Sequence, residues 1–226
     1  MNYINVKEGR FIERPNRFIA HVEIDGNIEI CHVKNTGRCM ELFVPNVRAF
    51  VQENNASHRK TKFDLISVYK GDRLVNVDSQ VPNGVFHEWV KRGNLFSKDA
   101  VVKPEVKYGN SRFDFYIEDG NRKAYVEVKG VTLEVDGHAM FPDAPTVRGI
   151  KHINELCVCL KEGYEAYIVF IIKMKGINSF SPNVKKHPDF NDALCEAYQQ
   201  GVKVLALDCI VTPDSIVADK FVDIVL

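Results

Sequence analysis

Alternating apolar and polar positions characterise the first third of the chain. Residues 18–24 alternate in this way and lead through Asp25-Gly26-Asn27 into a second alternating stretch, which is the pattern of a β-hairpin. Short strands without a convincing helix are predicted at 18–24, 28–33, 42–51 with a break at Pro45-Asn46, 63–69 and 74–77. A five-stranded OB barrel is the all-β domain that best matches this size. We therefore predict an OB-like β-barrel over residues 1–80, although the pattern alone does not distinguish it from a small sandwich.

The pattern changes after residue 80, where helical and strand-like segments alternate. Apolar residues at Ile150, Ile153, Leu156 and Leu160 have helical spacing, and Gly163 is well placed to end that helix. In order, the predicted elements are a helix at 83–93, strands at 101–107, 112–118 and 123–129, a helix at 146–163, a strand at 167–174, a helix at 190–200 and a strand at 202–207. This order predicts an α/β domain over residues 81–226, in which a mixed central sheet is flanked by helices.

Composition adds limits on function. The chain has 226 residues, of which 45% are hydrophobic and 27% charged, as in an ordinary protein with a sizeable core. Its formal net charge is zero, so any contact with nucleic acid must come from local basic patches. No apolar run reaches the length of a membrane span and no signal peptide is recognisable. The six cysteines are scattered, which favours reduced thiols and a cytoplasmic protein with no membrane association.

Two acidic side chains are predicted to face each other across the second and third strands of the α/β part. If Gly120-Asn121 forms a two-residue hairpin loop, Asp119 pairs with Arg122, and Asp114 then lies opposite Glu127. The other face of this hairpin is apolar and is predicted to be buried. Two facing carboxylates repel each other unless a positive charge lies between them. A divalent metal ion is the natural candidate for that charge.

A lysine and a third acid extend this pair. Lys129 points the same way as Glu127, because strand side chains alternate with a period of two. A second two-residue turn, Gly109-Asn110, would place Glu105 opposite Asp114. Oxygen ligands of this kind suit Mg²⁺ or Mn²⁺, and the lysine could orient or deprotonate an attacking water. The plainer alternative is an exposed strand face with weak salt bridges.

Motifs spread over nearly the whole chain match known proteins. They are Asn35-Thr36-Gly37-Arg38, Arg59-Lys60-Thr61, Glu105-Val106-Lys107-Tyr108-Gly109 with Ser111-Arg112, Tyr125-Val126-Glu127-Val128-Lys129, Val131-Thr132-Leu133, and Phe141-Pro142-Asp143-Ala144 through Thr146, Arg148-Gly149 and Lys151-His152. Asp114, Glu127 and Lys129 match the core of PD-(D/E)xK nucleases, in which the acids bind metal and the lysine assists hydrolysis. As a set, the motifs resemble the sugar fermentation stimulation protein family (SfsA). One departure is Gly130, where asparagine is expected.

The resemblance implies an architecture and an activity. Proteins of this family are described as DNA-binding, with an OB-like part and a nuclease-like part, and are linked to regulation of sugar, particularly maltose, metabolism. It implies a PD-(D/E)xK nuclease-like domain over 81–226, with non-specific DNA as partner. Phosphodiester hydrolysis with Mg or Mn would then use Asp114, Glu127 and Lys129 as catalytic residues, with Glu105 as a further metal ligand. Two alternatives stay open: a DNA-binding regulatory factor whose nuclease-like site is inactive, and a metal-binding interaction module without a nucleic-acid partner.

Basic side chains supply candidate contacts to DNA phosphates. The stretch from Ser57 to Lys62 is basic, although a solvated loop explains it equally well from the sequence alone. Arg148 and His152 are predicted to lie one turn apart on their helix, opposite its apolar face, although an exposed histidine without a function is the commoner case. The candidates are Lys34, Arg38, Arg59, Lys60, Lys62, Arg112, Arg148, Lys151 and His152.

Two further segments are predicted to lie near the acidic site. Glu88, on the helix before the three strands, competes with Glu105 for the role of the additional acid. Residues 136–145, which include His138 and Asp143, are predicted to form a shaped loop over the site, because they contain a glycine and two prolines.

Overall fold

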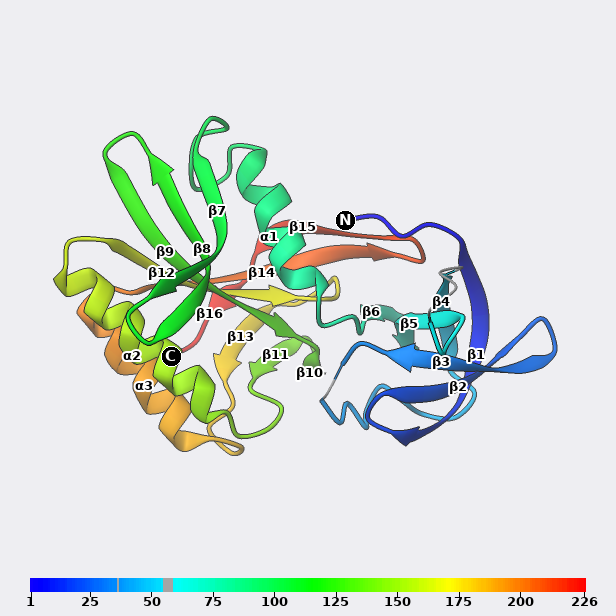
Figure 1. Cartoon of the computed structure of the whole chain (residues 1–226). Coiled ribbons are helices and arrows are strands. Elements are labelled where there is room, and N and C mark those ends of the chain that lie inside the picture. Colours follow the sequence, from blue (N-terminus) through cyan, green and yellow to red (C-terminus); the bar gives the residue numbers. More distant parts are fainter. Residues whose placement is uncertain (36, 55–58) are drawn as a thin grey trace. The chain divides into compact units, whose positions relative to one another are not determined.

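The structure is a computed structural model that describes residues 1–35, 37–54 and 59–226. Thr36 and the segment 55–58, with Ser57 and His58 of the predicted basic loop, lie outside the described residues. The chain divides into two compact units (Figure 1). The first comprises residues 1–81, 173–175 and 209–217, and the second comprises 82–172, 176–208 and 218–226. Two short segments from the second half of the chain therefore belong to the first unit, which the pattern of the sequence did not reveal.

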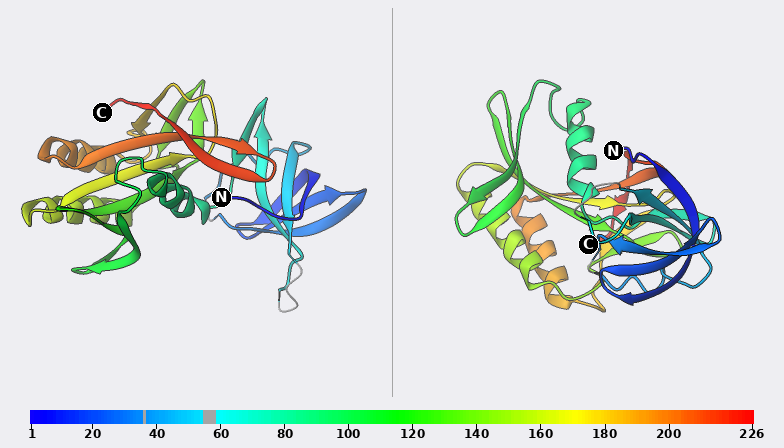
Figure 2. Two further views of the ribbon diagram at one scale, coloured as in Figure 1. Left: turned by 90° about the horizontal axis from the view of Figure 1, so that it is seen from above. Right: turned by 45° about the vertical axis from the view of Figure 1, so that its right-hand side comes forward.

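The first unit is built on a closed β-barrel. Its strands are β1 (Val6–Asn16), β2 (Ile19–Ile24), β3 (Asn27–Val33), β4 (Arg48–Glu53), β5 (Phe63–Lys70) and β6 (Arg73–Asn76). They follow the order β3-β2-β1-β4-β5-β6, and a parallel pairing between β3 and β5 closes β1 to β5 into a ring. The predicted barrel is confirmed, and the sandwich alternative is wrong. Figure 2 shows these strands from two further directions.

The first strand and the segment at 42–44 correct the sequence prediction for this unit. Strand β1 is missing from the predicted strands because charged residues occupy most of its outward positions. Its inward positions include Phe11, which is buried, and Gly9, where a Cβ would come within 2.5 Å of the carbonyl oxygen of Glu23. Leu42 is buried but lies in a turn rather than a strand, since its N–H and that of Phe43 both bond to the carbonyl of Cys39.

The second unit is a mixed α/β domain. Its helices are α1 (Val81–Lys91), α2 (Val147–Lys161) and α3 (Pro188–Gln200). Its large sheet has the order β15-β14-β12-β9-β8-β7, with strands β7 (Val101–Tyr108), β8 (Ser111–Asp119), β9 (Arg122–Val131), β12 (Glu165–Ile172), β14 (Lys203–Thr212) and β15 (Ser215–Phe221). Residues 209–217, at the end of β14 and the start of β15, are the part of this sheet that belongs to the first unit. Strand β12 runs parallel to β9 and β14, whereas β7, β8 and β9 are antiparallel. Helices α2 and α3 pack side by side, and α2 also contacts β8, β9 and β12 (Figures 1 and 2).

A smaller sheet contains the segment that was predicted to be a loop over the site. It has the order β10-β11-β13-β16, with strands β10 (Leu133–Val135), β11 (His138–Phe141), β13 (Ser179–Pro182) and β16 (Asp223–Ile224). Most of the apolar part of the predicted loop is therefore strand β11, which forms a hairpin with β10. The imidazole of His138 is within 2.8 Å of the hydroxyls of Ser179 and Ser181, while Asp143 is exposed.

The described residues contain no helix that is both long and apolar enough to cross a membrane. All six cysteines are free thiols.

Candidate functional site

The two predicted hairpin registers are confirmed. The β8–β9 pairs run from Asp119 with Arg122 to Phe115 with Val126, as the Gly120-Asn121 turn predicts. The β7–β8 pairs begin at Tyr108 with Ser111, as predicted from the Gly109-Asn110 turn. The predicted apolar face is also buried, and comprises Phe113, Phe115, Ile117, Ala124, Val126 and Val128.

Asp114 lies where the β8–β9 ladder ends, and its carboxylate is held by two neutral donors. Its Oδ2 accepts a hydrogen bond from the backbone N–H of Val128 on β9, at 2.7 Å. Its Oδ1 accepts one from the Nδ2 of Asn83 on α1, at 2.8 Å. The sequence placed residue 83 only at the start of a predicted helix and did not reveal this contact, because the contact depends on where α1 packs.

Glu127 is the buried centre of the site. Its Oε1 accepts hydrogen bonds from the Nζ of Lys129 and from the Nδ1 of His152. Its Oε2 is buried and has no hydrogen-bond partner among the described residues. A buried carboxylate oxygen without a donor is costly, so it indicates either a functional role or a bound group.

The pKa values of the two carboxyl groups shift in opposite directions. Burial raises the pKa of Asp114, and the nearby charge of Glu127 raises it further. Burial also acts to raise the pKa of Glu127, but its hydrogen bonds with His152 and its contact with Lys129 outweigh burial and lower it below the ordinary value. Paired acids whose pKa values diverge are common at functional sites.

His152 faces the sheet, which corrects its predicted place opposite the apolar face of α2. Only 4% of its surface is exposed, and its ring packs edge-on to Phe113. Helix α2 begins after Thr146, whose Oγ1 accepts the N–H of Gly149 as an N-cap. The Nε of Arg148 donates toward the Nε2 of His152 at 3.4 Å, so Nε2 acts as the acceptor and Nδ1 carries the proton toward Glu127.

Neither candidate for a third acid is brought into contact with this pair. Glu105 has a left-handed backbone, with φ of 56°, at the one position where the β7–β8 pairing is interrupted. Its side chain is exposed and lies 3.6 Å from Arg112. Glu88 pairs along its own helix with Arg92 at 3.9 Å.

The residues present fit a small, hard divalent cation. Mg²⁺ is commonly held by one or two carboxylates and keeps several waters. Asp114 and Glu127 supply carboxylates from adjacent strands, and Oε2 of Glu127 is an acceptor without a donor. No cluster of three or more His, Cys, Asp or Glu side chains that could hold a metal occurs within residues 1–35, 37–54 and 59–226. A cation here would therefore depend on the two carboxylates and on water.

Several predicted DNA contacts in the first unit are engaged within the protein. The carboxylate of Asp64 is fully buried and accepts hydrogen bonds from both terminal nitrogens of Arg59. The Nζ of Lys34 lies 3.2 Å from the Oδ2 of Asp64. Lys62 pairs with Glu53 at 3.0 Å. Lys60 and Arg38 are exposed. The cations of this unit that remain available at the surface are therefore fewer than the sequence suggests.

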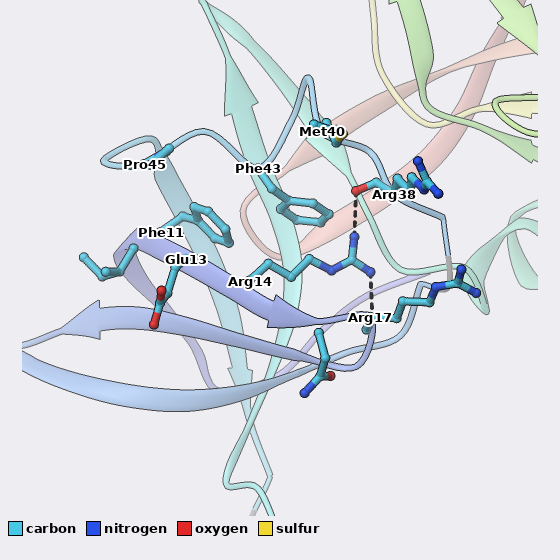
Figure 3. A pocket seen from close by; sticks show the side chains of 10 residues that line it. Phe11, Glu13, Arg14, Arg17, Arg38, Met40, Phe43 and Pro45 are labelled. Atoms are coloured by element: carbon cyan, nitrogen blue, oxygen red, sulfur yellow. Dashed lines mark hydrogen bonds between the residues drawn. The ribbon is translucent and has the colours of Figure 1, made fainter.

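Arg38 lines a surface cavity of about 650 Å³ in the barrel unit (Figure 3). The guanidinium of Arg14 lies 4.7 Å from the ring centre of Phe43, and donates hydrogen bonds to the backbone carbonyls of residues 17, 35, 37 and 38. Arg14 thereby holds the loop that presents Arg38 and Met40 at the cavity.

The remaining DNA-contact candidates meet in a basic pocket of the second unit. The pocket has a volume of about 470 Å³ and lies between the β7–β8 turn and α2. Its charged and polar residues are Lys107, Asn110, Ser111, Arg112, Arg148, Lys151 and His152. His152 therefore belongs both to this pocket and to the carboxylate site.

Comparisons with known proteins agree along the whole chain. The family model described as "SfsA N-terminal OB domain" matches residues 12–77, and the one described as "Sugar fermentation stimulation protein RE domain" matches residues 80–215. A sugar fermentation stimulation protein homolog of Clostridium beijerinckii is 57% identical over all of both chains. One from Desulfitobacterium hafniense is 61% identical over 100% of this chain and 99% of its own.

A solved structure is also similar. The structure of Pyrococcus furiosus SfsA in complex with Ca²⁺ matches with a TM-score of 0.89 and 28% identity, over 100% of this chain and 98% of that one. The OB family model fits the closed barrel of the first unit. The chain belongs to the sugar fermentation stimulation protein family, SfsA.

Proposed function

We propose that this protein binds DNA and hydrolyses its phosphodiester bonds at a Mg²⁺- or Mn²⁺-dependent site of the PD-(D/E)xK type in the second unit. The observation that carries the proposal is the carboxylate of Glu127, which is buried beside Asp114 and has one oxygen bound by a lysine and a histidine and the other without a donor. Such an arrangement favours a cation as the missing partner.

The side chains of the site would have different roles in hydrolysis. A divalent cation held by Asp114 and Glu127 would supply charge stabilisation and a more acidic bound water. Asn83 and the N–H of Val128 orient Asp114, and His152 orients Glu127. Lys129, half-buried beside Glu127, would orient the attacking water or neutralise charge on the phosphate.

Two further observations support this proposal. The related Pyrococcus furiosus protein is in complex with Ca²⁺ in its solved structure, and Ca²⁺ shares the preference for oxygen ligands with Mg²⁺ and Mn²⁺. The basic pocket shares His152 with the carboxylate site, so cations that could hold a phosphate backbone lie next to the acids. The link to sugar metabolism rests on the family name.

Incubation of the purified chain with single- and double-stranded DNA and RNA, in Mg²⁺ or Mn²⁺, tests the proposal. We expect cleavage that falls at least about 100-fold in Asp114→Asn and Lys129→Ala, as for removal of a group that stabilises the transition state. Glu118→Gln on β8 and Lys123→Ala on β9 are matched controls, because both residues lie at the far ends of the same strands.

Each result has a distinct meaning. Cleavage that persists unchanged in both site variants contradicts the proposed site. DNA binding that weakens with salt, but without cleavage by the wild type, favours a DNA-binding factor with an inactive site. Metal binding without any nucleic-acid binding favours the interaction module.

A further inference from the structure

We infer that the basic pocket between the β7–β8 turn and α2 binds a terminal phosphate monoester of a nucleic-acid strand, and thus that strand ends are preferred ligands. This inference rests on the proposed function, because it places the phosphate beside the proposed hydrolytic site. It names a substrate class that the carboxylate site alone does not define.

The charge of the pocket is the first observation. Four cations line it, namely Lys107, Arg112, Arg148 and Lys151. Glu105 lies 3.6 Å from Arg112, and Glu155 lies 3.9 Å from Lys151. Within the described part of the chain, Lys107 and Arg148 have no ion pair with an acidic side chain. The pocket therefore carries excess positive charge, in a chain whose net charge is zero.

An unused hydroxyl group is the second observation. Ser111, the first residue of β8, lines the pocket and is 92% buried, since only 8% of its surface is exposed. Its Oγ has no hydrogen-bond partner in the part of the chain that the structure describes. A buried hydroxyl without a partner is unfavourable, and a phosphate oxygen is an acceptor that suits both this hydroxyl and the cations that line the same pocket.

The walls of the pocket are tied together. The Nζ of Lys151 on α2 donates a hydrogen bond to the carbonyl of Asn110 in the β7–β8 turn, at 3.0 Å. Arg148, one turn earlier, contacts His152, whose other ring nitrogen bonds to Glu127. A group bound in this pocket is therefore one imidazole ring away from the proposed metal ligand.

These features suit a monoester better than the phosphodiester of a continuous strand. A terminal phosphate carries a charge of about −1.5 to −2 at neutral pH, whereas a backbone phosphodiester carries only −1. The bridge from Lys151 to Asn110 closes one side of the pocket, which favours a group with a single attachment to the strand. A 5′-phosphate and a 3′-phosphate share this chemistry.

Binding without hydrolysis tests the inference. Fluorescence anisotropy of the wild-type chain in EDTA would compare short oligonucleotides that carry a 5′-phosphate, a 3′-phosphate or hydroxyl groups at both ends. We expect one phosphorylated end to bind about tenfold more tightly than the hydroxyl form, and inorganic phosphate to compete for that difference. Lys107→Gln should reduce the preference to about twofold or less, whereas Lys123→Gln, which removes an equal charge from the start of β9, should retain it.

Ser111→Ala separates binding from folding. Loss of a hydroxyl that has no partner should leave the melting temperature unchanged or raise it, while the preference for the phosphorylated end falls. Equal affinity for all three oligonucleotides, or a preference that persists in both Lys107→Gln and Ser111→Ala, would overturn the inference. Cleavage without an end preference would overturn the inference and leave the proposed function intact. An end preference without cleavage would support the inference and contradict the proposed nuclease activity.

Discussion

Strand β9 contributes residues to two charged clusters, and these clusters differ in how completely their carboxylates are bonded. The Glu165 cluster, near the start of the strand, consists of Arg122, Glu165, Tyr167 and Lys203. The Glu127 cluster, further along the strand, consists of Asp114, Glu127, Lys129 and His152.

In the Glu165 cluster both carboxylate oxygens have donors. The Nε of Arg122 donates to Oε1 at 2.7 Å, and Lys203 donates to Oε2 at 2.8 Å. Hydrogen bonding with Arg122 is the main reason why the pKa of Glu165 lies far below its ordinary range. The side chain is 26% exposed, so its desolvation is also modest.

In the Glu127 cluster the carboxylate is more deeply buried than that of Glu165 but less completely hydrogen-bonded. The side chain of Glu127 is only 3% exposed, yet one of its oxygens has no partner among the described residues. Asp114 is held by neutral donors only, and its pKa is raised, first by burial. The fold bonds the carboxylate of Glu165 fully on the neighbouring strand β12, so incomplete bonding at Glu127 is a local property that suits a bound cation.

The largest expected difference between the clusters is in hydrolysis. Glu127→Gln should reduce metal-dependent cleavage at least about 100-fold, which corresponds to about 2.7 kcal/mol of transition-state stabilisation. Glu165→Gln should change the rate by no more than about twofold once the folded fraction is taken into account. Measurement of initial rates at saturating Mn²⁺ checks both values. Equal losses of cleavage rate in the two variants would show that the difference in carboxylate bonding is unrelated to catalysis.

The order of the two variants should be opposite for stability. Glu165→Gln weakens charge-assisted bonds and should lower the free energy of unfolding by about 1–3 kcal/mol. Glu127→Gln also weakens charge-assisted bonds, but it relieves the burial of a carboxylate that acts against them, so its cost should be smaller than that of Glu165→Gln. Urea unfolding can be followed by the fluorescence of Trp89, which is the single tryptophan and is buried in the second unit. A larger loss of unfolding free energy in Glu127→Gln than in Glu165→Gln would contradict the view that Glu127 contributes less to stability than Glu165.

A smaller difference is expected in the dependence of stability on pH. The lowered pKa of Glu165 gives a contribution that is complete above the ordinary value of 4.5 and is lost as the pH falls through the folded-state pKa. The raised pKa of Asp114 acts with the opposite sign: its contribution is complete below 3.8 and is lost as the pH rises through the folded-state pKa.

Unfolding at a series of pH values separates these two carboxyl groups. Asp114→Asn should remove part of the decline in stability above pH 3.8. Glu165→Gln should instead bring its stability closer to that of the wild type as the pH falls below 4.5. The same slope in wild type and Asp114→Asn would show that the pKa of Asp114 is not raised.

What the sequence could predict was local. The glycine-containing turns determine the registers of β7, β8 and β9, so the pairing and the buried face follow from counting residues. The same counting places Glu105 correctly in register, yet its positive φ interrupts the ladder there and its side chain pairs with Arg112. Turn chemistry carries no information about such a local departure.

What the sequence missed depends on packing between elements. His152 was expected on the outer face of α2, but the helix presents it to Glu127. Asn83 reaches Asp114 across a separation of 31 residues. The charged strand β1 lacks the apolar alternation that predicts strands, and it pairs through its backbone with β2 and β4. Such contacts are properties of the assembled fold, not of a spacing in one segment.

Thermal unfolding with and without Ca²⁺ or Mn²⁺ tests the central claim most directly, because it detects a bound cation without requiring catalysis. We predict that the wild-type melting temperature rises with cation concentration, as expected when a ligand binds only the folded state. The rise should persist in Glu165→Gln and be absent in Glu127→Gln. An increase in melting temperature of the same size in Glu127→Gln, or no increase in the wild type, would contradict the assignment of the Glu127 carboxylate as a cation ligand.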